Sequence, residues 1–140
     1  MNFFDTNLLI AASLPMHAHH RECHSRLASL RKTGAACAAH SLVEAYSVLT
    51  RLPMPYRLDT SDAMRIMENT LSFATPIALT PDETIDTLRI LARQNLGGGV
   101  TFDALILACA RKTAAQRIYT CNGKHFRRIA PDLAPRILEP

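Results

Sequence analysis

Three carboxylates of this chain lie where a buried strand ends or a buried helix begins: Asp5, Glu44 and Asp103. Asp5 follows a short apolar run, residues 1–4, which is typical of a buried parallel strand. Like charges that come close repel one another unless a proton or a bound cation compensates. Oxygen ligands with open positions suit Mg²⁺ or Mn²⁺ better than zinc. These acids therefore indicate a divalent-metal site.

Two of these acids also have an ordinary structural interpretation. Glu44 comes three residues after Ser41, which is the capping-box pattern at a helix start. Asp103 lies in the first turn of a helix that is apolar nearly all round, where an acid is either a cap or needs a metal or charged partner. We favour a functional role for Asp103, and for Glu44 because it follows the second predicted strand.

A divalent ion held by carboxylates can orient a water molecule, promote its ionisation and neutralise charge on a phosphodiester. No serine or cysteine nucleophile is evident, so hydrolysis by metal-activated water is the simplest mechanism. A basic rim would hold the phosphate backbone, although each of its members could equally be a solvated surface charge. The candidates are Lys124, His125, Arg127 and Arg128, with Arg51 as a further possibility.

Short apolar segments alternate with amphipathic ones along the chain. Thr6 and Asn7 can cap the first helix, and Thr80 begins a strong helix start with Pro81 and acids in the first turn. The strands are expected at residues 1–5, 35–40, 76–79 and 117–120, with a short edge strand in the tail. The helices are expected at 6–12, 17–32, 41–52, 60–73, 80–94 and 100–110.

This alternation predicts an α/β fold with a parallel sheet covered on both faces. Right-handed crossovers bring the carboxyl ends of parallel strands to one edge of the sheet, where ligands bind. Asp5, Glu44 and Asp103 should therefore converge there, with Asn122 nearby. We expect one domain over residues 1–140, since no linker or internal repeat is visible.

Composition supports a folded protein with a basic surface. Hydrophobic residues make up 48% and charged residues 20% of the 140 residues, and the net charge is +4. An excess of positive charge suits a polyanion but is compatible with other partners. No apolar run is long enough to cross a bilayer and no signal pattern opens the chain, so we expect a cytoplasmic protein without membrane contact.

The cysteines and a cluster of histidines are two further groups of potential metal ligands. The four cysteines are scattered without a CxxC pair, so we interpret them as small core residues. His20 and His24, or His19 and Cys23, have the spacing of one helix face and could bind zinc. Two helix ligands do not complete a tetrahedral site, so we favour an exposed helix start for residues 17–24.

Four segments together resemble the PIN domains, and more narrowly the VapC ribonuclease toxins of bacterial toxin–antitoxin pairs. They occur in family order and span almost the whole chain. The segments are Phe-Asp-Thr-Asn at Asp5, Val-Glu-Ala-Tyr at Glu44 with Leu-Thr-Arg-Leu-Pro behind it, Phe-Asp-Ala-Leu-Ile at Asp103, and Tyr-Thr-Cys-Asn-Gly-Lys-His-Phe near the end.

The resemblance implies a three-layer α/β/α sandwich and Mg²⁺- or Mn²⁺-dependent endoribonuclease activity. It also implies a homodimer and a cognate VapB-like antitoxin whose tail occupies the acidic groove. Asp5, Glu44 and Asp103 match the acidic metal-site positions, and Thr6 matches the polar residue beside the first. The fourth position is Asn122, which can offer an oxygen or hold a water but lacks a charge.

Two other functions are compatible with parts of this pattern. A phosphatase could use Asp5 as a nucleophile, but haloacid dehalogenase-type phosphatases have a second Asp where this chain has Asn7. A module without catalysis could bind RNA or a protein after loss of the fourth acid. It would keep affinity for RNA and show no metal-dependent turnover.

Overall fold

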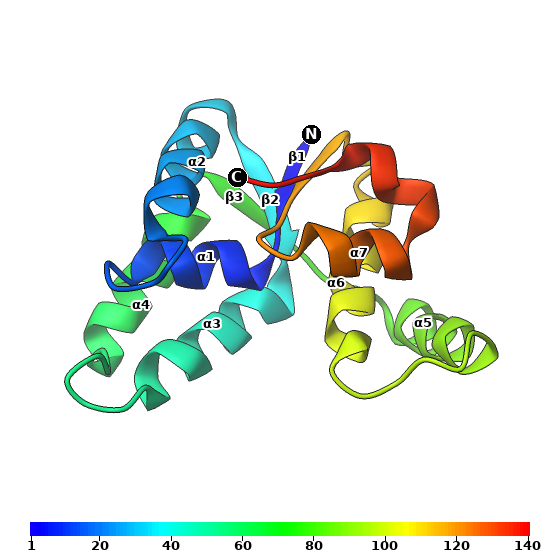
Figure 1. Cartoon of the computed structure of the whole chain (residues 1–140), viewed down its shortest axis with the longest axis horizontal. Coiled ribbons are helices and arrows are strands. Elements are labelled where there is room, and N and C mark those ends of the chain that lie inside the picture. The colour runs from blue at the N-terminus through cyan, green and yellow to red at the C-terminus, as the bar shows by residue number, and fades with distance from the viewer.

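The computed structural model describes residues 1–140 as a five-stranded parallel sheet between two layers of helices (Figure 1). The strands are β1 (Asn2–Phe4), β2 (Ala35–Ala38), β3 (Ala74–Ile77), β4 (Arg117–Tyr119) and β5 (Ile137–Leu138). The helices are α1 (Thr6–Ser13), α2 (His20–Thr33), α3 (Ala39–Arg51), α4 (Thr60–Leu71), α5 (Pro81–Arg93), α6 (Val100–Lys112) and α7 (Gly123–Ile129), followed by the 3₁₀ helix η1 (Pro131–Arg136).

The first strand lies at the centre of the sheet, whose order is β3-β2-β1-β4-β5. Phe3 pairs with Ala36 of β2 on one side and with Ile118 of β4 on the other, both in parallel register. The chain adds β2 and β3 outward from one side of β1 and then crosses to the other side for β4. The gap between the ends of β1 and β4 is therefore the topological switch point, where open α/β sheets bind ligands.

Successive side chains of the central strands point into opposite cores. Phe4 packs in one core with residues of α1, α2, α3 and α4, whereas Phe3 packs in the other with residues of α5, α6, α7 and η1. Ile118 and Tyr119 alternate in the same way. Both faces of the sheet are thus covered, which confirms the predicted three-layer α/β/α sandwich.

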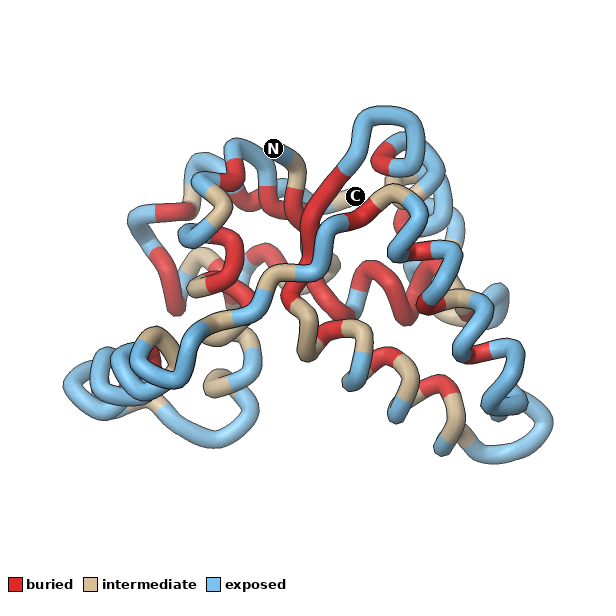
Figure 2. Tube along the Cα trace, turned by 180° about the vertical axis from the view of Figure 1, so that it is seen from behind, coloured by how far each residue is buried: buried red, intermediate tan, exposed pale blue.

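Several helix ends follow the predicted local chemistry. The Thr80 hydroxyl accepts from the Glu83 amide at 3.2 Å, and the Glu83 carboxylate accepts from the Thr80 amide at 2.7 Å, so the capping box at α5 is formed. Gly34 ends α2 with φ +78°, a conformation that L side chains rarely adopt. Helix α5 buries only Thr87 and Leu91 and is largely exposed (Figure 2).

Other boundaries differ from the sequence expectation. Strand β2 ends at Ala38, two residues before the expected end, because α3 begins directly behind it. Strand β3 runs over 74–77 instead of 76–79, in register with β2 from Ala35 onward. Helix α2 begins at His20 without a side-chain cap, so residues 17–19 precede it. Helices α7 and η1 were not predicted.

Candidate active site

Asp5 ends the central strand and begins the helix behind it. Its Oδ1 accepts from the Leu8 amide at 2.8 Å, so Asp5 itself is the N-cap of α1, not Thr6 or Asn7 as expected. Its Oδ2 accepts from the Thr120 hydroxyl at 2.6 Å, across the gap between β1 and β4. Both oxygens of this buried carboxylate are therefore fixed from two sides.

The environment of Asp5 favours its protonated form. Its pKa is raised from the ordinary 3.8 to about 7, chiefly by burial and to a smaller extent by the nearby carboxylates of Asp103 and Glu44, while the hydrogen bonds from Thr120 and Leu8 oppose the rise. The carboxylates of Asp103 and Glu44 thus lie near enough to Asp5 to influence its charge. That the three acids hold one ion stays a prediction.

Glu44 projects from α3 toward the start of α1. Its Oε2 accepts from the Thr6 hydroxyl at 3.0 Å, and the same hydroxyl lies 2.8 Å from Ser41 Oγ. Helix α3 begins at Ala39 and has no side-chain cap, so Ser41 and Glu44 form no capping box. The structural interpretation of Glu44 is therefore wrong, and its carboxylate is oriented by Thr6 instead.

Asp103 lies in the first turn of α6 and faces α7. Its Oδ2 is 2.9 Å from His125 Nδ1, and its side chain is 19% exposed. Burial raises the pKa of Asp103 and Glu44 adds to the rise, while His125 opposes it. Asn122 Nδ2 is 3.1 Å from the same His125 nitrogen. His125 therefore links the third acid to the fourth position.

The donor set fits a hydrated hard cation. The carboxylates at this edge, with Asn122 beside them, offer only oxygen ligands of the kind that Mg²⁺ and Mn²⁺ prefer. No three His, Cys, Asp or Glu side chains of the chain close into a tight ligand group. Mg²⁺ does not require one, because it usually binds through one or two carboxylates and keeps several waters.

The basic residues near this edge fall into two groups. Lys124 and Arg128 are exposed on α7, and Arg51 is exposed at the end of α3. Arg127 is engaged instead with the tail, because its guanidinium lies 3.3 Å from Glu139 Oε1 and donates to the Ile137 carbonyl at 2.9 Å. His125 is held by Asp103, as described above.

Two residues at the site were missed from the sequence. Thr120 has no exposed surface, bonds to Asp5, and accepts from the Asn122 amide at 2.9 Å. The sequence signal for Thr120 was a polar residue directly after β4, the strand that pairs with β1. His40 lies one turn before Glu44, and its Nε2 is buried without a hydrogen-bond partner. Burial lowers the pKa of His40 against the pull of Glu44.

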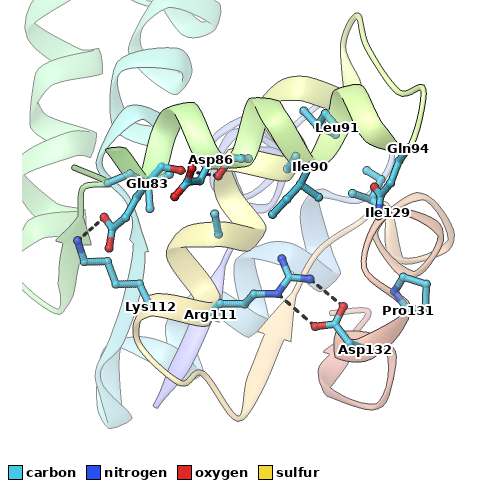
Figure 3. A pocket seen from close by; sticks show the side chains of 14 residues that line it. Glu83, Asp86, Ile90, Leu91, Gln94, Arg111, Lys112, Ile129, Pro131 and Asp132 are labelled. Atoms are coloured by element: carbon cyan, nitrogen blue, oxygen red, sulfur yellow. Dashed lines mark hydrogen bonds and ion pairs between the residues drawn. The ribbon is translucent and has the colours of Figure 1, made fainter. Parts of the chain in front are cut away.

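A large hollow lies away from these acids (Figure 3). It has a volume of about 670 Å³ and is lined by α5, α6 and the start of η1, with Ile90 and Leu91 on one wall. The ion pairs Lys112–Glu83 and Arg111–Asp132, each 2.7 Å long, flank it. None of the candidate site residues lines this hollow.

The histidines at the start of α2 do not form a closed ligand set. The rings of His20 and His24 lie 5.4 Å apart, and His20 Nδ1 contacts the Ala11 carbonyl at 3.0 Å. Cys23 points inward and is fully buried. No helix of the chain has the length and apolar character needed to span a bilayer.

Comparison with known proteins agrees with this architecture. The PIN domain family matches residues 3–131. Ribonuclease VapC27 of Mycobacterium tuberculosis is 42% identical over 82 residues, which cover 59% of this chain and 58% of VapC27. The match therefore spans less than two thirds of that relative. Ribonuclease VapC40 of the same organism is 31% identical over 112 residues, which cover 80% of each chain.

Two solved structures share the fold. VapC20 of Mycobacterium tuberculosis, described as a Sarcin-Ricin loop cleaving toxin, matches with a TM-score of 0.72 at 22% identity over 89% of this chain and 92% of that one. VapBC2 from Rickettsia felis, bound to a DNA fragment from their promoter, matches with a TM-score of 0.65 at 20% identity over 99% and 96%. The resemblance drawn from the four sequence segments is confirmed.

Proposed function

The chain belongs to the PIN domain family, and from this premise we propose that it is an Mg²⁺- or Mn²⁺-dependent endoribonuclease, the toxin of a toxin–antitoxin pair. Its relatives VapC27 and VapC40 are ribonucleases by name. The observation that most supports the proposal is the contact that joins the acids of two elements at the switch point of the sheet: Thr6, next to Asp5, donates to Glu44 at 3.0 Å. Acids that lie near one another need a cation to be ionised together.

Asp5, Glu44 and Asp103 would hold the ion, with Asn122 at the fourth position. The ion would neutralise charge on the phosphodiester and promote ionisation of a water. Thr120 and Thr6 orient the carboxylates of Asp5 and Glu44, each by one hydroxyl hydrogen bond. Orientation before the substrate binds lowers the entropic cost of reaching the reactive geometry.

Exposed cations on α7 would bind the RNA backbone beside these acids. Lys124 and Arg128 are free to do so, and His125 lies between Asp103 and Asn122, within reach of the same edge. We keep Arg127 as a weaker candidate, because its guanidinium is already bound to the tail. Their joint role is to offset the repulsion between the acids and the phosphates.

The sequence disfavours a phosphatase with Asp5 as nucleophile. Phosphatases of the haloacid dehalogenase type have a second Asp two residues on, where this chain has Asn7. The alternative is an RNA- or protein-binding module without catalysis. The cleavage experiment described below distinguishes it from the nuclease.

We also propose three partners: an RNA substrate, a VapB-like antitoxin and a second copy of the chain. The net charge of +4 suits the RNA. We propose the antitoxin because the relatives VapC27 and VapC40 are VapC proteins by name. The homodimer is supported by exposed apolar side chains on α5, namely Ile85, Leu88 and Ile90.

The decisive experiment is cleavage of total RNA by the purified protein with and without Mn²⁺ or Mg²⁺, with mapping of new 5′ ends. We expect defined cuts only when an ion is present. Asp5→Asn and Asp103→Asn should each lower the rate at least about a hundredfold. Asp62→Asn is the matched control, because Asp62 is an exposed acid on α4 that pairs only with Arg65.

A folded wild-type protein that binds RNA but cuts none with either ion would contradict the nuclease proposal and favour the binding module. Equal activity of the Asp5→Asn and Asp62→Asn variants would contradict the assignment of the site. Circular dichroism of each variant checks that loss of cleavage does not arise from unfolding.

A further inference from the structure

Two cysteines that are distant in sequence lie in contact beside the acidic site. Cys23 comes from α2 and Cys121 follows β4, and their sulfurs are 2.9 Å apart. All four cysteines of the chain are free thiols. Cys109 is directed elsewhere, because its sulfur lies 3.5 Å from the Ile77 carbonyl, and no sulfur contact joins it to Cys37. Cys23 and Cys121 are thus the one pair arranged for a covalent link.

Solvent reaches this pair at Cys121. A hollow of about 150 Å³ opens onto Cys121 and is lined by His19, Glu22, Glu139 and Pro140 besides. Cys23 has no exposed surface. A small oxidant can therefore reach the sulfur of Cys121 before that of Cys23. The Cys23 sulfur then reacts with the oxidised Cys121.

We propose that Cys23 and Cys121 form a reversible redox-modification site whose oxidant is a small peroxide and whose product is a disulfide. The Cys121 thiol attacks hydrogen peroxide, the O–O bond breaks, one oxygen stays on sulfur as sulfenic acid, and the other leaves as water with the thiol proton. The Cys23 thiol then attacks the Cys121 sulfur, the S–S bond forms, the S–O bond breaks, and the hydroxyl leaves as a second water with the Cys23 proton. Both sulfurs are oxidised, the peroxide is reduced, and a dithiol reverses the reaction.

The burial of the pair limits the rate of the first step. Cys23 has no exposed surface and Cys121 is half-buried, so peroxide meets the sulfurs slowly and the site responds to sustained exposure. The second step needs no diffusion, because the partner sulfur is already in contact.

Closure of the disulfide should disturb the acidic site. A disulfide bond is about 2.05 Å long, so sulfurs now at 2.9 Å must approach by about 1 Å. Cys121 lies between Thr120, which holds Asp5, and Asn122, which contacts His125. A displacement of that size in a catalytic group can cost about a hundredfold in rate. This coupling rests on the proposed function, whereas the cross-link does not.

The cross-link is tested by treating reduced, metal-free protein with hydrogen peroxide under native conditions, alkylating the remaining thiols and mapping peptides by mass spectrometry. We expect one linked peptide pair, Cys23 with Cys121, while Cys37 and Cys109 are alkylated. Dithiothreitol should reverse the link. Cys121→Ser should abolish it, and Cys109→Ser is the matched control that should leave it unchanged.

The coupling is tested on the same samples by two measurements. RNA cleavage should fall at least about tenfold on oxidation and recover with dithiothreitol, and the Cys121→Ser variant should not respond. The rise in melting temperature on adding Mn²⁺ should be smaller in the oxidised protein, which reports on the site even if no RNA is cut. A cross-link that alters neither measurement would overturn the coupling.

Folded protein in which Cys23 and Cys121 stay reduced, or in which Cys37 and Cys109 link first, would overturn the proposal. So would zinc that copurifies on Cys23 and Cys121 and protects them from peroxide. If the cross-link forms on oxidation but the reduced protein cuts no RNA, the result would count against the proposed nuclease. The proposal of the redox site would not be affected.

Discussion

At the scale of single residues, Asp5 serves two purposes with one carboxylate. One oxygen caps α1 and the other is held by Thr120, while the group lies among the candidate metal ligands. An alanine at this position would remove the helix cap together with the charge, and loss of a cap costs about 1 kcal/mol. Asparagine is therefore the better probe, because it can still accept from the Leu8 amide.

The raised pKa of Asp5 predicts that the metal-free protein loses stability as pH rises from about 4 to about 7. Below this range both the folded and unfolded states bind the proton; within it the unfolded chain releases its proton first, which favours unfolding. Each pKa unit corresponds to about 1.4 kcal/mol, so the loss should reach a few kcal/mol. Urea titrations at pH 5 and pH 8 measure it.

The Asp5→Asn variant is the control for this prediction, and it should lose most of the pH dependence. Mg²⁺ or Mn²⁺ should stabilise the wild-type protein more at pH 8 than at pH 5, since a metal binds the deprotonated ligands. Equal pH dependence of the two proteins would contradict the assignment to Asp5.

The Thr6 hydroxyl gives a second prediction. Thr6→Val keeps the shape of the side chain but leaves Ser41 and Glu44 without their partner, so unfolding free energy should fall by about 1–2 kcal/mol. Cleavage should fall between about tenfold and a hundredfold, because Glu44 is no longer oriented. Thr6→Ser retains the hydroxyl and should retain most activity in the same assay.

The sequence allowed the acids and the neighbouring Thr6 to be identified, but not the other side chains that hold the acids. Asp5, Glu44 and Asp103 are recognisable because a carboxylate is unusual next to buried apolar segments. Thr120 and His125 bind Asp5 and Asp103 through contacts that bridge 115 and 22 residues, which no local pattern encodes. The pairing of Cys23 with Cys121 was missed for the same reason.

At the scale of elements, the start of α5 offers a test of the fold that leaves the site untouched. Thr80→Ala removes one bond of the capping box and should cost about 1 kcal/mol in unfolding free energy. RNA cleavage should not change. Glu68→Ala, at an exposed position of α4, is the control and should stay within about 0.5 kcal/mol.

Elements were predictable where their ends depend on local chemistry. The capping box of α5 and the glycine that ends α2 are examples. Strand β3 was shifted by two residues because its limits depend on pairing with β2, which the local sequence does not specify. Helix α7 was missed because Gly123 suggests a turn, whereas in the structure this glycine packs closely against Glu139 and Arg127.

At the scale of the whole molecule, both cores share the central strands. We therefore propose that residues 1–140 form one domain. Helix α5 lies at the outer side of this body and leaves apolar side chains exposed (Figures 1 and 2). A surface of this kind is typical of a protein–protein contact.

Dimerisation through α5 predicts that Leu88→Lys lowers the mass measured by light scattering from twice 15.5 kDa to 15.5 kDa. The reason is that a buried ammonium without a partner is unfavourable in an apolar interface. Leu71→Lys on α4 is the matched control, because Leu71 is 44% exposed and Leu88 is 42% exposed. If Leu71→Lys dissociated the dimer and Leu88→Lys did not, the interface would have to be assigned to α4 instead of α5.

The central position of β1 bears on how the protein is made. Asp5 is translated before its partner Thr120, and β4, one of the two strands that pair with β1, follows more than a hundred residues later. A nascent chain therefore carries this acid without the side chain that fixes it until residue 120 has been made. We expect fragments that end before residue 117 to be inert.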